Sequence, residues 1–159
     1  MLELTAYHEA GHAVMAHLLG GRVRQVTIEP DNDDGPRRSG DTQILWRRGT
    51  IAERDFARIS VQVHLAGPAA EMAYSSEPYH PALVAEWTAD WRGAFEAAAI
   101  LHADERKRTQ YLEEALRRLY HQLRGDDVWM ALAALADSLL AHETLDEEQV
   151  REVLDELLG

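Results

Sequence analysis

The fold of this chain is decided by the stretch LELTAYHEAGHAVMAHLL, residues Leu2–Leu19. Apolar residues recur there at every third or fourth position, and further small apolar residues fill most of the remaining circumference of a helix. A helix that is apolar on nearly all sides is a buried one, so we predict a central helix over these residues. Gly20-Gly21 follows and supplies a residue that tolerates the positive φ at which helices commonly end.

The remaining sequence predicts a mainly α (α+β) fold, in one domain that spans residues 1–159. Two β-prone runs, Val23–Glu29 and Thr42–Trp46, flank the turn-rich residues 31–40 and predict a small hairpin or sheet. A long helix is expected from Ala52 to Ala73, with Pro68 kinking or interrupting it, before a loop at Ser75–Pro81. Further amphipathic helices are expected at Thr88–His102, Glu105–Leu123, Asp126–His142 and Asp146–Leu157.

Composition excludes several kinds of function. The chain has 16 Lys and Arg against 28 Asp and Glu, a net charge of −12 that argues against nucleic acid or an anionic membrane as partner. It has no cysteine, so a metal must be held by nitrogen and oxygen ligands. No apolar run approaches the ~20 residues of a membrane span and no signal segment opens the sequence, so a soluble, cytoplasmic protein is expected. The phosphate-binding pattern G-x-x-x-x-G-K-[ST] is absent as well, which predicts no nucleotide motor.

Residues 8–12 read His-Glu-Ala-Gly-His, the pattern H-E-x-x-H, inside the predicted first helix. His8 and His12 share one helical face, so both imidazoles can reach a single zinc ion at about 2.0–2.1 Å. Glu9 lies beside that face, where its carboxylate suits a general base that takes a proton from a zinc-activated water. In a chain with 8 His the pattern can also arise by chance. The motif predicts a Zn²⁺ hydrolase with Glu9 as its catalytic residue.

A catalytic zinc takes three protein ligands and a water, so one ligand must come from another segment. Glu71 and Asp90 are the main candidates; less favoured are His64, His80, Glu86 and His102. Asp90 also suits the first turn of a helix, and Glu71 also suits a solvent-facing position, so spacing alone does not choose between them. His17 lies on the side of the first helix opposite His8 and is expected to be an ordinary, partly buried histidine.

Several blocks of the sequence resemble the zinc-peptidase domain of the FtsH-type membrane AAA+ proteases. The helix AYHEAGHAV is similar to the metal-binding helix of that family almost letter for letter. Later blocks resemble its V-T-I-x-P strand, its L-x-G-x-A-A-E helix and its E-T-L-D-x-x-x-V segment. These matches, in the same order along nearly the entire chain, are AYHEAGHAV (Ala6–Val14), VTIEP (Val26–Pro30), LAGPAAE (Leu65–Glu71) and HETLDEEQV (His142–Val150).

The resemblance implies a helical, zincin-like domain and assigns two further site residues. The third zinc ligand of the family is an aspartate in T-G-A-x-N-D-x-x-x-A, and Asp90, four residues before Ala94, partly matches it. Glu71 matches a glutamate beside the metal helix, which implies a partner for a ligand imidazole rather than a ligand. The chain departs from the family in having no ATPase module or membrane segment, in lacking a G-M-S-like loop at Ala103–Arg108, and in having Pro68 where arginine is usual.

Two functions from different classes follow from these patterns. The leading prediction is a stand-alone zinc metallopeptidase that hydrolyses unfolded proteins or peptides without ATP, with His8, His12 and Asp90 as metal ligands. The alternative is a metal-binding, oligomerising or adaptor module that keeps the peptidase fold with little turnover and serves a separate ATPase. An intact Glu9 argues against the alternative, because a protein that only binds metal needs no base. Hydrolysis of a non-peptide amide would use the same residues.

Overall fold

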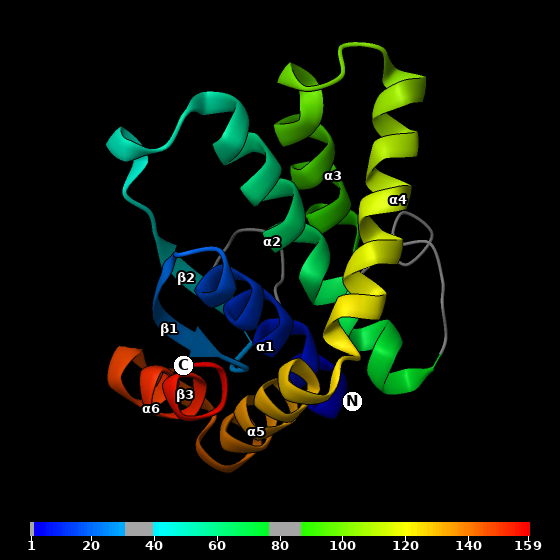
Figure 1. The fold of residues 1–159 in the computed structure, drawn as a ribbon. Helices are drawn as coiled ribbons and strands as arrows, with labels where there is room; N and C mark the ends of the chain where they lie inside the picture. The colour runs from blue at the N-terminus through cyan, green and yellow to red at the C-terminus, as the bar shows by residue number, and fades with distance from the viewer. Residues whose placement is uncertain (1, 31–39, 77–86) are drawn as a thin grey trace.

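The computed structural model describes residues 2–30, 40–76 and 87–159. Helices dominate, with one small sheet, so the predicted mainly α (α+β) class is confirmed (Figure 1). The α-helices are α1 (Leu2–Leu18), α2 (Glu53–Ser75), α3 (Thr88–Ala97), α4 (Glu105–Leu123), α5 (Asp126–His142) and α6 (Glu147–Leu158). The strands are β1 (Arg22–Thr27), β2 (Asp41–Leu45) and β3 (Thr144–Asp146), and short 3₁₀ turns are η1 (Arg48–Thr50) and η4 (Ala98–Ile100).

Helix α1 is the centre of the structure, as its sequence predicts. Every residue from Ala6 to Ala16 is buried except His8, which is half-buried. The helix packs against α2, α5 and β1, and Figure 1 shows it between the sheet and the helical layer of α2, α3 and α4. It ends as predicted, with Gly20 at a φ of 90° just beyond its last turn. The H-E-x-x-H pattern therefore lies on a central helix that is buried along most of its length.

The sheet contains the predicted hairpin and one additional strand. β1 pairs antiparallel with β2, with Val26 opposite Thr42, and the register shifts between Val23 and Gln25. β1 also pairs antiparallel with β3, which gives the strand order β2-β1-β3. The third strand was not predicted, because its three residues are too few to show an alternating pattern. Of the described strands, β2 and β3 are the edges.

Two other predictions need correction, and two lie mostly outside the described residues. Helix α2 is not interrupted at Pro68; the surrounding residues are buried against α1, and this packing holds the helical path. The helix expected to reach His102 ends at Ala97 and tightens into the turn η4. The turn-rich residues 31–39 and most of the predicted loop Ser75–Pro81 lie outside the described residues.

Among the helices that the structure describes, none combines the length and apolar character that crossing a membrane requires.

Candidate metal centre

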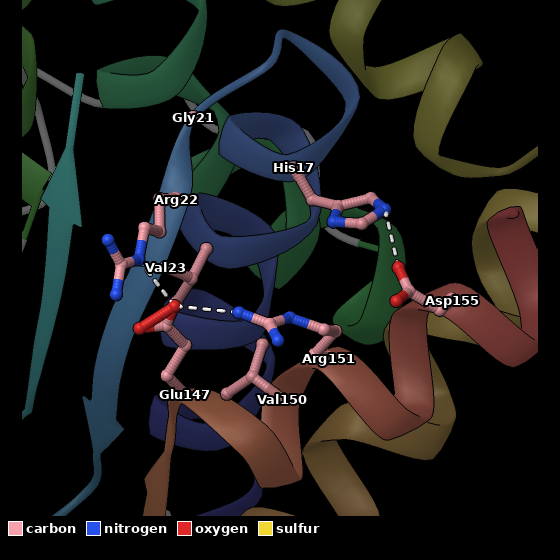
Figure 2. Close-up of a pocket in the computed structure, with 8 residues that line it drawn as sticks. All are labelled: His17, Gly21, Arg22, Val23, Glu147, Val150, Arg151 and Asp155. Atoms are coloured by element: carbon pink, nitrogen blue, oxygen red, sulfur yellow. Dashed lines mark hydrogen bonds and ion pairs between the residues drawn. The ribbon is translucent and has the colours of Figure 1, made fainter. Parts of the chain in front are cut away.

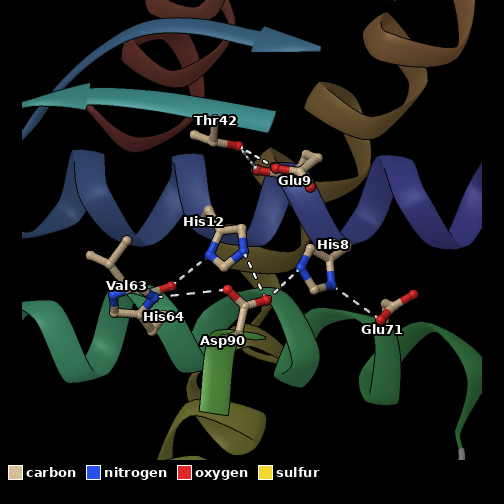
Figure 3. A network of polar contacts seen from close by, with 8 residues as sticks. All are labelled: His8, Glu9, His12, Thr42, Val63, His64, Glu71 and Asp90. Atoms are coloured by element: carbon tan, nitrogen blue, oxygen red, sulfur yellow. Dashed lines mark hydrogen bonds and ion pairs between the residues drawn. The ribbon is translucent and has the colours of Figure 1, made fainter. Parts of the chain in front are cut away.

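Three side chains from two distant segments converge between α1, α2 and α3. His8 and His12 project from α1 toward Asp90, the third residue of α3 (Figure 3). Asp90 Oδ2 lies 2.8 Å from His8 Nε2 and 3.4 Å from His12 Nε2. One ligand atom from each of the three residues lies within 4.8 Å of the others. The structure thus brings together the three residues predicted as metal ligands, while leaving Asp90 in the first helical turn as well.

Glycines let the helices approach closely enough to form this site. A Cβ on Gly11, between the two histidines, would lie 2.5 Å from the backbone oxygen of Ala66 on α2. A Cβ on Gly67 would lie 2.5 Å from His12 Nε2 and 2.8 Å from His8 Nε2. All three distances are below ordinary van der Waals contact, so a larger residue at either glycine would push the helices or the imidazoles apart. The backbone of Gly67 therefore lies directly against the Nε2 atoms of His8 and His12.

The opposite nitrogen of each imidazole is held by a hydrogen-bond acceptor. His8 Nδ1 lies 3.1 Å from Glu71 Oε2, and His12 Nδ1 lies 2.6 Å from the carbonyl oxygen of Val63. When Nδ1 carries the proton and donates it, Nε2 is left with its lone pair directed toward Asp90. Metal-binding histidines are commonly oriented in this way. Glu71 thus lies beside the His8 ring, and with 4% of its surface exposed it is not solvent-facing.

The ionisable side chains of the cluster shift one another's pKa. Burial alone lowers the pKa of His8, but hydrogen bonds to Asp90 and Glu71 outweigh this effect and raise the pKa to about 10. Burial raises the pKa of Asp90, yet the neighbouring imidazoles more than compensate and hold it below its usual range. A metal ion needs the neutral imidazoles, so its binding would release the proton that these groups share.

The donor set fits a divalent metal such as Zn²⁺. Two imidazole nitrogens and one carboxylate oxygen are the ligand types of catalytic zinc sites, and tetrahedral bonds of about 2.0–2.1 Å would place the ligand atoms about 3.3 Å apart. The separations of Asp90 Oδ2 from the two Nε2 atoms, 2.8 and 3.4 Å, bracket that value, and the ligand atoms of all three residues lie within 4.8 Å of one another. The three side chains keep 11–19% of their surface exposed, so the cluster is not fully closed to solvent.

Glu9 lies on the neighbouring face of α1 and turns toward the sheet (Figure 3). It is buried, and its carboxylate Oε1 accepts a hydrogen bond of 2.7 Å from the hydroxyl of Thr42 on β2. A Cβ on Gly40, just before β2, would lie 2.9 Å from Glu9 Cγ, so the carboxylate is also confined sterically. Thr42 was not among the predicted site residues; its place on a predicted strand near the H-E-x-x-H helix was the available signal.

The less favoured ligand candidates lie in different places. His64 Nδ1 is 3.8 Å from Asp90 Oδ1, beside the cluster, but it is not one of the three converging ligands. His102 instead lies with its ring 4.9 Å from that of Tyr111. His80 and Glu86 are outside the described residues. His17 is partly buried as expected, and its Nε2 lies 3.8 Å from Asp155.

Comparison with known proteins adds no assignment to this geometry. No family model matches the sequence, and no curated protein matches it. The resemblance to the FtsH-type peptidase domain therefore stays a prediction that depends on the quoted sequence blocks.

Proposed function

We propose that this protein is a zinc-dependent metalloendopeptidase that hydrolyses unfolded proteins or peptides without a nucleotide motor of its own. The observation that carries the proposal is the convergence of His8, His12 and Asp90, with the carboxylate of Glu9 on the same buried helix. Each imidazole also has an acceptor at Nδ1, which sets the tautomer that a metal ligand requires. A site that only needed charge balance would not require two imidazoles that both direct Nε2 at one carboxylate and hold Nδ1 on an acceptor.

The residues divide the chemistry of amide hydrolysis among them. His8, His12 and Asp90 would hold Zn²⁺, and a bound Zn²⁺ supplies Lewis acidity toward a carbonyl oxygen and toward water. Glu9 accepts a proton from the attacking water and returns it to the leaving amine. Thr42 donates to Oε1 of Glu9 and so fixes one carboxylate oxygen, which leaves Oε2 as the proton acceptor.

The free edge of β2 suits an extended peptide. β1 pairs with a strand on each side, whereas β2 pairs only with β1 among the described strands. Thr42 lies on β2 and also contacts Glu9, so this strand runs beside the proposed base. A peptide added along β2 would be held through its backbone, whatever its side chains, as hydrolysis of varied unfolded chains requires.

One observation favours a second candidate function. The carboxylate of Glu9 is hydrogen-bonded to Thr42 and turned toward the sheet, while the three ligands face α2 and α3 (Figure 3). If Glu9 kept this position, the protein would be a metal-binding, oligomerising or adaptor module with little turnover. Under that function a homo-oligomer or a separate ATPase would be its partner.

Metal content and proteolysis, measured together, separate the two functions. The peptidase proposal predicts about one zinc per chain and cleavage of an unfolded, casein-like substrate that stops on addition of a chelator. Glu9→Gln keeps the shape of the side chain but removes the base, so it should retain zinc and lower the cleavage rate at least 100-fold. Glu156→Gln, the same exchange on the exposed face of α6, is the matched control and should cleave like the parent.

Two results would contradict the peptidase proposal. Zinc-loaded parent protein that leaves the substrate intact would favour the metal-binding module. Glu9→Gln that cleaves at the parental rate would show that Glu9 is not the base. Zinc loss in Glu9→Gln would instead assign Glu9 a part in holding the metal.

A further inference from the structure

We infer that His64 is a positioning residue for Asp90, which holds one carboxylate oxygen so that only the other is presented to the metal. This inference rests on the metal site of the proposed function and deepens it. Its consequence is a three-ligand site with one coordination position left for substrate.

The two oxygens of Asp90 face different partners. Oδ2 lies between the imidazoles of His8 and His12, at 2.8 and 3.4 Å from their Nε2 atoms. Oδ1 faces His64, with 3.8 Å between Oδ1 and Nδ1 (Figure 3). This distance is too long for a direct hydrogen bond, so the ring acts through its N–H dipole or a bridging water. The carboxylate is thus held from both sides.

The ring of His64 is itself held in place by α3. A Cβ on Gly93, one turn beyond Asp90, would lie 2.6 Å from Cε1 and 2.8 Å from Nδ1 of His64. The ring therefore rests directly on the backbone of the helix that carries Asp90, and only glycine leaves room for it. The side chain is 42% exposed, so a residue at position 93 could move the ring toward solvent without disturbing the core.

Control of Oδ1 matters because a carboxylate can bind a metal through one or both oxygens. A catalytic zinc site needs three protein ligands and an open position, and a second bound oxygen would occupy that position. His64 competes for Oδ1 and so favours binding through Oδ2 alone. Residues that orient a ligand in this way commonly change metal affinity by 10- to 100-fold when replaced.

The test uses variants of the full chain. His64→Leu keeps a branched side chain but removes the donor, whereas His64→Asn places an amide N–H close to the position of Nδ1. Gly93→Ala keeps His64 but displaces its ring, and alanine favours the helix, so a loss of affinity could not be attributed to unfolding of α3. His17→Leu is the matched control, since His17 also has a nitrogen 3.8 Å from a carboxylate oxygen, but outside the cluster.

Two measurements on these variants do not depend on activity. One is the dissociation constant for zinc, from competition with a chelator. The other is the visible absorption of bound Co²⁺, which weakens when the number of ligands rises. We expect His64→Leu and Gly93→Ala to weaken zinc binding about tenfold and to lower the cobalt absorption. His64→Asn and His17→Leu should resemble the parent.

Each outcome bears on the inference. Parental zinc affinity and cobalt absorption in both His64→Leu and Gly93→Ala would overturn it while leaving the proposed metal site intact. Weaker zinc binding in His17→Leu as well would also overturn it, because the effect would then be unspecific. A parent chain that binds no zinc would overturn this inference together with the proposed function, and that result is distinguishable from the other two.

Discussion

Helix α1 carries histidines in two clusters that use the same chemical groups differently. In the first, which we call the His8 cluster, His8 and His12 face Asp90. Glu71 lies beside His8, and His64 lies beside Asp90. The second, the His17 cluster, lies at the other end of the helix and consists of His17, Arg22, Glu147, Arg151 and Asp155 (Figure 2). Both contain imidazoles near carboxylates, yet only the first converges on one point.

Burial and pairing account for the difference. The side chains of His8 and His12, the proposed ligands, are 11–13% exposed, whereas His17 is 24% and its partner Asp155 is 52% exposed. In the His17 cluster, Glu147 already accepts from both Arg22 and Arg151, so its carboxylate is engaged by two guanidinium groups and does not face the imidazole. Exposed pairs of this kind contribute little to stability. An imidazole near an acid therefore indicates a metal site only when several such groups are buried and point to one position.

The largest effect should follow from removing the acid of each cluster in turn. Asp90→Ala deletes one of three proposed ligands, so we expect zinc affinity to fall at least 100-fold. Asp155→Ala deletes the equivalent partner of His17 and should leave zinc affinity unchanged, because Asp155 touches no proposed ligand. Chelator competition measures both constants, and circular dichroism checks that both variants are folded.

Two results would contradict this contrast between the His8 cluster and the His17 cluster. Full zinc retention in Asp90→Ala would move the role of third ligand to another acid, first of all Glu71, which lies 3.1 Å from His8 Nδ1. Weaker binding in Asp155→Ala would show that the two clusters are coupled along α1.

A smaller effect is expected at β2, where Thr42 donates a hydrogen bond to Glu9, the proposed general base. Proline at Gln43 or at Ile44, whichever amide faces away from β1, removes a donor to an added peptide strand. The outward-facing position should lower the cleavage of an unfolded substrate about tenfold while zinc content stays parental. Gln43→Ala and Ile44→Ala, which keep the amide, are the controls. Parental cleavage by both proline variants would mean that substrate is held elsewhere.

Sequence reasoning was most successful where a local pattern determines the structure. The apolar circumference of α1 predicted its burial, and the spacing of His8 and His12 predicted that their imidazoles would face one point. Spacing left Glu71 and Asp90 as alternatives, and only the family resemblance implied Asp90 as the ligand; the packing of α2 and α3 on α1 places Asp90 at Nε2 of His8 and Glu71 at Nδ1. That distinction depends on how the helices pack in three dimensions, which the spacing of residues along the chain does not determine.

The features that the sequence analysis missed all depend on contacts between distant segments. Val63 acts through its backbone oxygen, which carries no signature of residue type. Thr42 reaches Glu9 only because β1 places β2 beside α1. Strand β3 exists because β1 has an edge available to it, and its residues show no β pattern of their own.

The smallest effect that we predict concerns the start of α6, next to the His17 cluster. Asp146 caps this helix: its carboxylate accepts from the backbone of Gln149, and the side chain of Gln149 accepts from the backbone of Asp146. Asp146→Ala removes this capping box and should lower the free energy of unfolding by about 1 kcal/mol. Thermal unfolding should then begin about 2–4 °C lower, while zinc affinity stays parental, because the capping contacts join α6 to no residue of the His8 cluster. Asp127→Ala, an acid in the first turn of α5 that is not its cap, is the control and should change the unfolding temperature less. A fall in zinc affinity with Asp146→Ala would show that order at the His17 end of α1 is needed to hold the metal ligands, and the two clusters would then have to be treated as one site.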